Sequence, residues 1–143
     1  MRVANTLSRA QVQMVLNKIP FFRLFSSDER ERLAGEQSSF HVAREGEYVI
    51  RQGSQERAFY ILLSGAADVL DADNSRLTGL QPGDVFGEIG FLSDQVRTSH
   101  VMATTASILL RIDQALMQRL RPEMREKIKD ELIQILVRRI LQS

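Results

Sequence analysis

Short β-rich runs separated by glycines fill the middle of the chain, and they constrain its fold more than any other feature. Seven glycines lie between or beside these runs, and glycine supplies the positive φ angles that tight corners need. Many short strands with this spacing favour an antiparallel β-barrel or jelly roll. The runs are Glu47–Ile50, Ala58–Leu63, Ala67–Leu70, Arg76–Leu80, Ser99–Thr105 and Ser107–Ile112.

The segments on either side of the runs have helical periodicity instead. Leu7–Ile19 carries an apolar stripe, and Ser26 with Glu29 predicts a capping box that opens a second helix. Asp113 is placed to cap a short helix, and a longer one is predicted over Pro122–Leu141.

The order of these segments predicts an α+β fold. It is an antiparallel β-barrel (jelly roll) at about 38–112, flanked by N-terminal helices and by two C-terminal helices at about 113–141. We expect the 143 residues to form a single domain, because this length suits one domain and no linker or repeat divides it.

Composition excludes several classes of function. The chain has no cysteine, and His41 and His100 are its only histidines, so we expect no metal centre and no thiolate catalysis. A net charge of +1 lacks the excess typical of a nucleic-acid-binding domain. No apolar run approaches the ~20 residues of a membrane span, and the N-terminus is too polar for a signal peptide. We expect a cytoplasmic protein.

One segment, Gly87–Ser99, has the residues of a binding site. Gly87 and Gly90 remove side chains where a ligand could approach the backbone, and free N–H groups at the start of a helical turn bind anions. Arg97 lies ten residues after Gly87, far enough for the chain to fold back over the same spot, and a guanidinium there could clamp a phosphate with two parallel bonds. Glu88 would repel a phosphate but suits a sugar hydroxyl, so the pattern indicates a nucleotide.

A second interpretation of the same residues is purely structural. The glycines would be corners of the barrel, and Glu88 and Arg97 would form an ordinary surface ion pair. Glycine-containing motifs match many unrelated sequences, so spacing alone leaves both interpretations open.

The segment closely resembles the phosphate-binding cassette of the cyclic nucleotide-binding domain family. The matching residues are Gly87-Glu88-Ile89-Gly90 and Arg97-Thr98-Ser99, and we call Gly87–Ser99 the cassette. Ile19–Phe22, Glu45–Gly53 and Phe59–Gly65 also resemble segments of this family. The family includes the catabolite activator protein and the regulatory subunit of cAMP-dependent protein kinase. The resemblance extends roughly from residue 16 to residue 141.

The resemblance implies a role for each matching residue. Glu88 would accept a hydrogen bond from the ribose 2′-hydroxyl, and Arg97 would pair with the cyclic phosphate. A residue of the last helix would cap the base, and the candidates are Leu132, Ile135 and Leu136. The full set of implied ligand-binding residues is Val69, Leu77, Phe86, Gly87, Glu88, Ile89, Gly90, Arg97, Thr98 and Ser99.

The resemblance implies a non-enzymatic sensor of a 3′,5′-cyclic nucleotide, with cAMP favoured over cGMP and no other cofactor. Binding would be signalled by movement of the C-terminal helix. The alternative is a degenerate domain that docks proteins without binding nucleotide, because Asp94 and Val96 stand where many members have Gly and Pro. DNA binding would need a helix-turn-helix after the last helix, and we expect none in this chain. The sequence does not identify a downstream protein partner.

The last predicted helix also carries a long apolar stripe. A terminal helix of about twenty residues is stabilised by burying such a stripe rather than by propensity alone. One small ligand cannot cover its whole length, so we expect part of it to pack on a second copy as a homodimer. The stripe consists of Met124, Ile128, Leu132, Ile135, Leu136 and Ile140.

Overall fold

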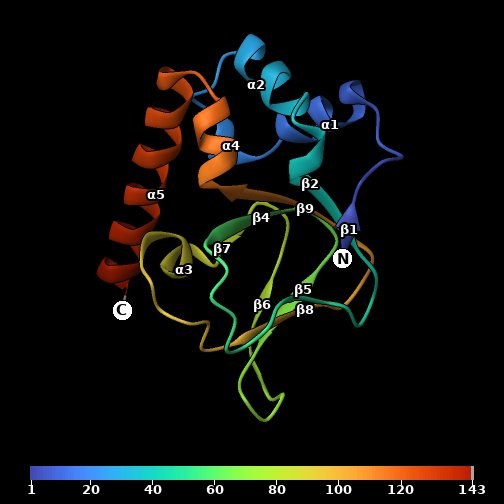
Figure 1. Cartoon of the computed structure of the whole chain (residues 1–143), viewed down its shortest axis with the longest axis vertical. Helices are drawn as coiled ribbons and strands as arrows, with labels where there is room; N and C mark the ends of the chain where they lie inside the picture. Colours follow the sequence, from blue (N-terminus) through green and yellow to red (C-terminus); the bar gives the residue numbers. More distant parts are fainter. Residues whose placement is uncertain (143) are drawn as a thin grey trace.

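Two antiparallel β-sheets and a group of helices make up the fold (Figure 1). A computed structural model describes residues 1–142. The strands are β1 (Arg2–Val3), β2 (Phe40–Ala43), β3 (Tyr48–Ile50), β4 (Ala58–Ser64), β5 (Ala67–Leu70), β6 (Arg76–Leu80), β7 (Val85–Phe86), β8 (His100–Ala103) and β9 (Ser107–Asp113). The helices are α1 (Arg9–Leu16), α2 (Ser27–Ala34), α3 (Glu88–Leu92), α4 (Gln114–Arg119) and α5 (Pro122–Gln142), with 3-10 turns at Pro20–Phe22 and Gln37–Ser39.

The two sheets form the jelly-roll barrel that the sequence predicted. The larger sheet has the order β1-β2-β9-β4-β7 and the smaller one β3-β8-β5-β6, and their strands pair antiparallel. All six predicted runs contain strands. The patterns missed β1, β2 and β7, which complete the larger sheet.

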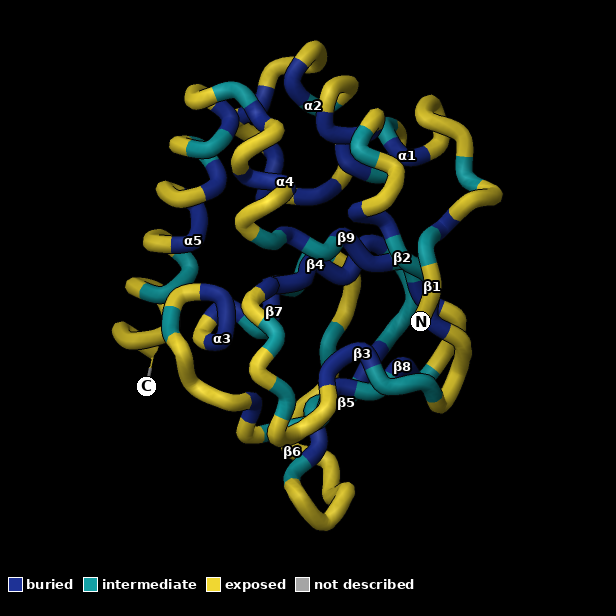
Figure 2. The backbone as a smooth tube through the Cα atoms, in the orientation of Figure 1, coloured by how far each residue is buried: buried dark blue, intermediate teal, exposed yellow. Residues whose placement is uncertain are grey.

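Strand β4 is buried on both faces, and this burial separates two cores. Side chains alternate along a strand. Phe59 and Ile61 therefore join the core beneath the helices, whereas Tyr60 and Leu62 join the core between the two sheets. Figure 2 shows this strand in the middle of the molecule, with the helices on one side and the smaller sheet on the other. Because neither face of β4 meets water, its sequence is almost continuously apolar.

Side-chain caps set the starts of two predicted helices. The Ser26 hydroxyl accepts the Glu29 N–H at 3.1 Å, and the Glu29 carboxylate accepts the Ser26 N–H at 2.7 Å, which confirms the capping box of α2. Asp113 accepts the Leu116 N–H at 2.8 Å and caps α4 as predicted. Burial alone would raise the pKa of Glu29, but Lys127 of α5, 2.6 Å away, and the bonds with Ser26 hold this pKa below its usual value.

The first half of α5 is anchored in the helical core. Met124, Ile128 and Leu132 are buried there, and Ile135 packs against its edge. This half of the predicted stripe is therefore covered by the chain's own barrel and helices. Although α5 has 21 residues, neither it nor any other helix within residues 1–142 is long and apolar enough to cross a membrane.

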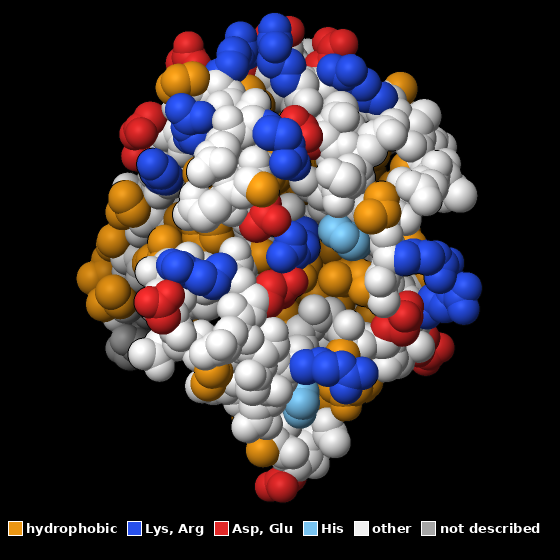
Figure 3. All heavy atoms as spheres, viewed as in Figure 1, with side chains coloured by type: hydrophobic (Ala, Val, Ile, Leu, Met, Phe, Trp, Pro, Cys, Tyr) orange, Lys and Arg blue, Asp and Glu red, His pale blue; other side chains and the backbone are white. Residues whose placement is uncertain are grey.

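The second half of α5 carries apolar side chains on its outer side. Leu136 of the predicted stripe is only half-buried, and Ile140 is exposed. Ile133 and Val137, which the predicted stripe omitted, are also exposed. Figure 3 shows apolar side chains gathered along the outer edge of this helix. We call Ile133, Val137, Ile140 and Leu141 the exposed apolar face of α5.

We expect Ser26→Ala to lower the free energy of unfolding by about 1 kcal/mol, because it removes the oxygen that caps α2. Urea unfolding followed by circular dichroism measures the change. Ser27→Ala is the matched control: Ser27 is exposed in the first turn, and its loss should change stability by less than about 0.5 kcal/mol. Equal losses in the two variants would contradict a specific role for the cap.

Candidate functional site

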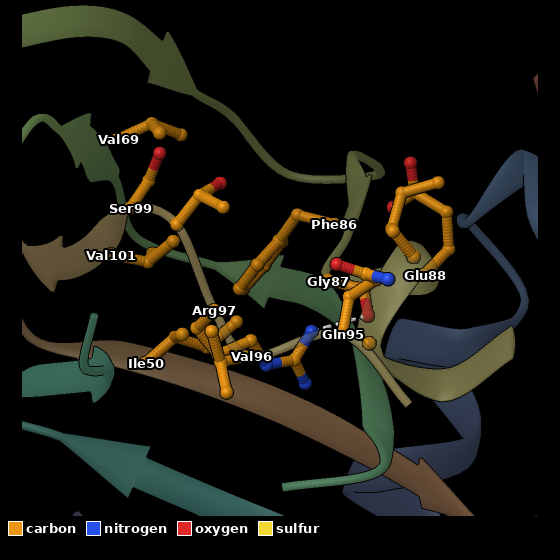
Figure 4. Close-up of a pocket in the computed structure, with 13 residues that line it drawn as sticks. Ile50, Val69, Phe86, Gly87, Glu88, Gln95, Val96, Arg97, Ser99 and Val101 are labelled. Carbon is orange, nitrogen blue, oxygen red and sulfur yellow. Dashed lines mark hydrogen bonds between the residues drawn. The ribbon is translucent and has the colours of Figure 1, made fainter. Parts of the chain in front are cut away.

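A cavity of about 350 Å³ lies between the cassette and the smaller sheet (Figure 4). This volume is in the range of small-molecule sites. Nine of the ten predicted binding residues line it: Val69, Phe86, Gly87, Glu88, Ile89, Gly90, Arg97, Thr98 and Ser99. Sequence reasoning missed four more lining residues, Ile50, Gln95, Val96 and Val101. The side chains of the two sheets give the cavity an apolar wall, in which the Phe86 ring stacks on Tyr60 with centroids 5.5 Å apart.

The tenth predicted residue, Leu77, lies outside the cavity. It belongs to β6, an edge strand, and its side chain is 58% exposed. The strand register explains this position: Thr78 stands opposite the cavity residue Val69, and the pairing then skips to Arg76 opposite Leu70. Leu77 lies at this irregularity. Because side chains alternate along a strand, Leu77 points to the face opposite that of Thr78, away from the cavity.

The three candidates for capping the base also lie away from the cavity. Leu132 is buried in the helical core, and Ile135 is packed at the edge of that core. Leu136 is half-buried on the next turn and does not line the cavity. All three positions follow from the docking of α5 against the helical core.

The guanidinium of Arg97 is buried at the cavity and bonded to the main chain. Its Nη1 donates to the Gly87 carbonyl at 2.6 Å, and its Nη2 donates to the Ala58 carbonyl of β4. The Nε–H is also buried and has no hydrogen-bond partner within residues 1–142. Leaving a buried donor unpaired is unfavourable. A ligand that places a hydrogen-bond acceptor beside this N–H would therefore be bound more tightly.

Two glycines make room for this arrangement. Gly87 has a φ of +79°, a left-handed conformation that glycine adopts without strain, and it starts α3. A Cβ on Gly90 would clash with the Arg97 guanidinium and force this side chain out of its position. Both glycines are therefore needed to pack the guanidinium against α3.

A network of polar and charged groups lies next to Arg97, outside the lining of the cavity. The Tyr60 hydroxyl donates to both carboxylate oxygens of Glu56, at 3.0 and 2.9 Å, and Arg111 Nε donates to the same carboxylate at 2.9 Å. Nη2 of Arg97 is 3.8 Å from Glu56. Burial lowers the pKa of Arg97, and the negative charge of Glu56 opposes this shift. Sequence reasoning missed Glu56 and Arg111, since no local motif links them to the cassette.

The carboxylate of Glu88 is bonded to α5 instead of to Arg97. Glu88 is 7% exposed and accepts a hydrogen bond from Nη1 of Arg139, while Nη2 of Arg139 donates to the Val85 carbonyl at 2.6 Å. The second interpretation of the sequence, a surface ion pair between Glu88 and Arg97, is therefore wrong. Burial lowers the pKa of Arg139, and nearby Asp84 opposes this shift.

Asp94 departs from the family pattern, and its charge has a partner. Its carboxylate is almost fully exposed and forms an ion pair with Arg57 at 3.1 Å. Exposed pairs of this kind contribute at most about 1 kcal/mol. The pair nonetheless gives the extra negative charge of the cassette a cation outside the cavity.

The site combines a buried cation, a carboxylate acceptor and an apolar wall. This combination suits a small molecule that carries an anionic group, a hydroxyl and a flat ring. Within residues 1–142, no group of three or more His, Cys, Asp or Glu residues is arranged to hold a metal ion.

Comparison with known proteins identifies the family. The family model for the cyclic nucleotide-binding domain matches residues 40–123, from the first residue of β2 to the start of α5. The chain therefore belongs to the cyclic nucleotide-binding domain family, as the cassette motif predicted.

The chain is similar to segments of much longer proteins and spans less than a third of the length of these relatives. It is 31% identical over 101 residues to a cAMP-dependent protein kinase regulatory subunit from Debaryomyces hansenii, covering 71% of this chain and 22% of that protein. It is also 31% identical over 108 residues to a cGMP-dependent protein kinase from Toxoplasma gondii, covering 74% and 10%. A cyclic nucleotide-binding domain from Methylobacillus flagellatus has the same fold, with a TM-score of 0.74 at 19% identity over 94% of this chain and 79% of that one.

Proposed function

We propose that this chain is a cytoplasmic, non-enzymatic sensor that binds a 3′,5′-cyclic nucleotide in the cavity, cAMP more tightly than cGMP. The observation that carries this proposal is the buried guanidinium of Arg97 with its unpaired Nε–H at a cavity of suitable size. A cyclic phosphate would supply the missing acceptor and the negative charge together. Neither histidine lines the cavity. The two charged residues that do line it, Glu88 and Arg97, bind the ligand in this proposal.

The remaining cavity residues have complementary roles in the proposal. Backbone N–H groups around Gly90 and Thr98 would bond the phosphate oxygens. Glu88 would accept the ribose 2′-hydroxyl, and Phe86 with Val69 would contact the sugar and base. Membership of the family and the lining of the cavity by these residues support the assignment.

The apolar wall of the cavity supports the proposed preference for cAMP. Guanine carries a carbonyl and an amide N–H that adenine lacks, and burying unpaired polar groups is unfavourable. Ile50, Val69 and Val101 offer such groups no partner through their side chains. Thr98 also lines the cavity, and a threonine at this position is compatible with either nucleotide. The similarity to a regulatory subunit of a cAMP-dependent kinase also supports this choice.

In this proposal the signal leaves the site through Arg139. Glu88 would bind the ribose hydroxyl while its other contact, Arg139, belongs to the second half of α5. Nucleotide binding would thus change the energy of docking that half of the helix. This route replaces the capping of the base by Leu132, Ile135 or Leu136, which lie away from the cavity.

We expect Arg97→Ala to weaken cAMP binding at least tenfold, since a charge-assisted bond to a buried phosphate contributes about 1.5–3 kcal/mol. Isothermal titration calorimetry with cAMP and cGMP measures the affinity, and Arg97→Lys should restore it only in part because an ammonium lacks the planar fork.

Arg32→Ala, at an exposed arginine of α2, is the control for loss of charge and should bind like the wild type. Equal affinity in Arg97→Ala and the wild type would refute the site. A wild-type protein that binds neither nucleotide would favour a docking module without a ligand.

We expect Arg139→Ala to weaken cAMP binding about fivefold, because it leaves the buried charge of Glu88 without its cation beside the incoming phosphate. Hydrogen exchange should also show that residues 136–142 no longer respond to cAMP. The matched control is Arg138→Ala, whose guanidinium lies 3.6 Å from Glu131 instead. If both variants bind like the wild type, α5 is not coupled to the site through Arg139.

We further propose a homodimer through the exposed apolar face of α5. Val137→Asp should place a charge in that interface and yield monomers in sedimentation velocity, while Gln118→Asp, at an exposed residue of α4, should not. Val137 is a better probe than Leu136, which is half-buried in its own chain. A wild-type protein that stays monomeric at high concentration, with and without cAMP, would eliminate the dimer.

A further inference from the structure

Three hydrogen bonds from backbone N–H groups join the turn after β3 to the end of the cassette and to the first residue of β8. The Gly53 N–H donates to the Arg97 carbonyl at 2.8 Å, and the Arg97 N–H donates to the Ser54 carbonyl at 2.8 Å. The third, the Gln52 N–H, donates to Nδ1 of the His100 ring at 3.0 Å. The turn therefore bonds both the carbonyl and the N–H of Arg97, and the side chain of His100 accepts a hydrogen bond from the turn.

His100 makes this contact from the side of the smaller sheet that faces away from the cavity. Its neighbours Ser99 and Val101 line the cavity, as their labelled side chains in Figure 4 show. The His100 ring lies 5.1 Å from the ring of Tyr48, and the residue is only half-buried, so protons from solvent reach it.

The charged groups near His100 are engaged with other residues. On the side of β3, the Arg51 guanidinium stacks at 4.3 Å on the tyrosine ring that neighbours His100. On β5, Asp68 is already paired with Arg76 of β6 at 3.0 Å, and Asp71 accepts backbone N–H groups within the following turn. Within residues 1–142, no carboxylate forms an ion pair with His100.

We propose that neutral His100 is a positioning residue of the anion site, and that protonation of its ring weakens the binding of a phosphate at Arg97. A neutral imidazole accepts at one nitrogen, whereas an imidazolium carries N–H groups on both and accepts nothing. Protonation sets the ring N–H against the Gln52 N–H, so the turn loses one of its three hydrogen bonds and restrains the main chain of Arg97 less firmly.

The consequence is a pH-dependent affinity. Histidine side chains change charge between about pH 5 and pH 8, so the neutral form dominates at the upper end of this range and is lost on acidification. Nucleotide affinity is therefore full near neutral pH and falls in mild acid. This inference rests on the proposed function, because it concerns the same anion site.

Calorimetric titration with cAMP at about pH 7.5 and about pH 5.5 tests the proposal. The wild type should bind about fivefold more weakly at the lower pH, the contribution of one hydrogen bond between neutral groups. His100→Asn places an amide oxygen near the Nδ1 position and does not titrate, so its affinity should be the same at both values. His100→Ala should bind weakly at both, and His41→Asn, at the other histidine, should keep the wild-type profile.

Hydrogen exchange at the Gln52 amide, in protein without nucleotide, gives a second readout. Protection of this amide should be lost in acid in the wild type and retained in His100→Asn. The proposal would be overturned if the affinity of His100→Asn fell with pH as much as that of the wild type. It would also be overturned if protection of the Gln52 amide in the wild type did not change with pH. If the wild type binds no cAMP at either pH, the proposed function fails, and exchange at Gln52 and Arg97 still decides whether His100 holds the turn.

Discussion

Burial of the Arg97 guanidinium is the interaction on which the arrangement of the site depends. An unpaired buried cation is unfavourable by several kcal/mol, so the chain must bring acceptors to it. One acceptor is the Gly87 carbonyl at the start of α3 and the other is the Ala58 carbonyl at the start of β4. A single side chain thereby ties the cassette to the larger sheet. The same packing requires the absence of a side chain at Gly90.

Strand β4 then determines what can lie on each side of the site. Its alternating side chains fill the helical core on one face and the core between the sheets on the other. The apolar stripe at the start of α5 is buried in the helical core, and the ion pair between this helix and the cassette lies near the end of α5. The meeting point is polar: Arg139 reaches the buried Glu88 and the Val85 carbonyl.

Much of the fold was predictable because its signals are local. Glycine-bounded runs marked six of the nine strands, and the side chains of Ser26 and Asp113 marked two helix starts. Strands β1 and β7 were missed because each has two residues, too few to show a period. Leu77 was misplaced because alternation along a strand does not reveal where its register shifts.

The site was predictable where its residues are neighbours in sequence, and not where they are distant. The cassette motif supplied seven of the nine predicted residues that line the cavity, and the other two, Val69 and Phe86, lie outside the motif. The partners of its two charged side chains follow from the tertiary fold: Ala58 is 39 residues from Arg97, and Arg139 is 51 residues from Glu88. No local pattern contains such contacts, so only the three-dimensional structure supplies them.

The burial of α5 is confined to its first part. Its last buried residue is Leu132, and about ten residues, or roughly 15 Å of helix, extend beyond it. By simple geometry, a tilt of about 10° at Leu132 would displace the end of this segment by roughly 3 Å. Because Arg139 lies close to that end, its ion pair with Glu88 holds the part of the helix that a tilt would displace furthest.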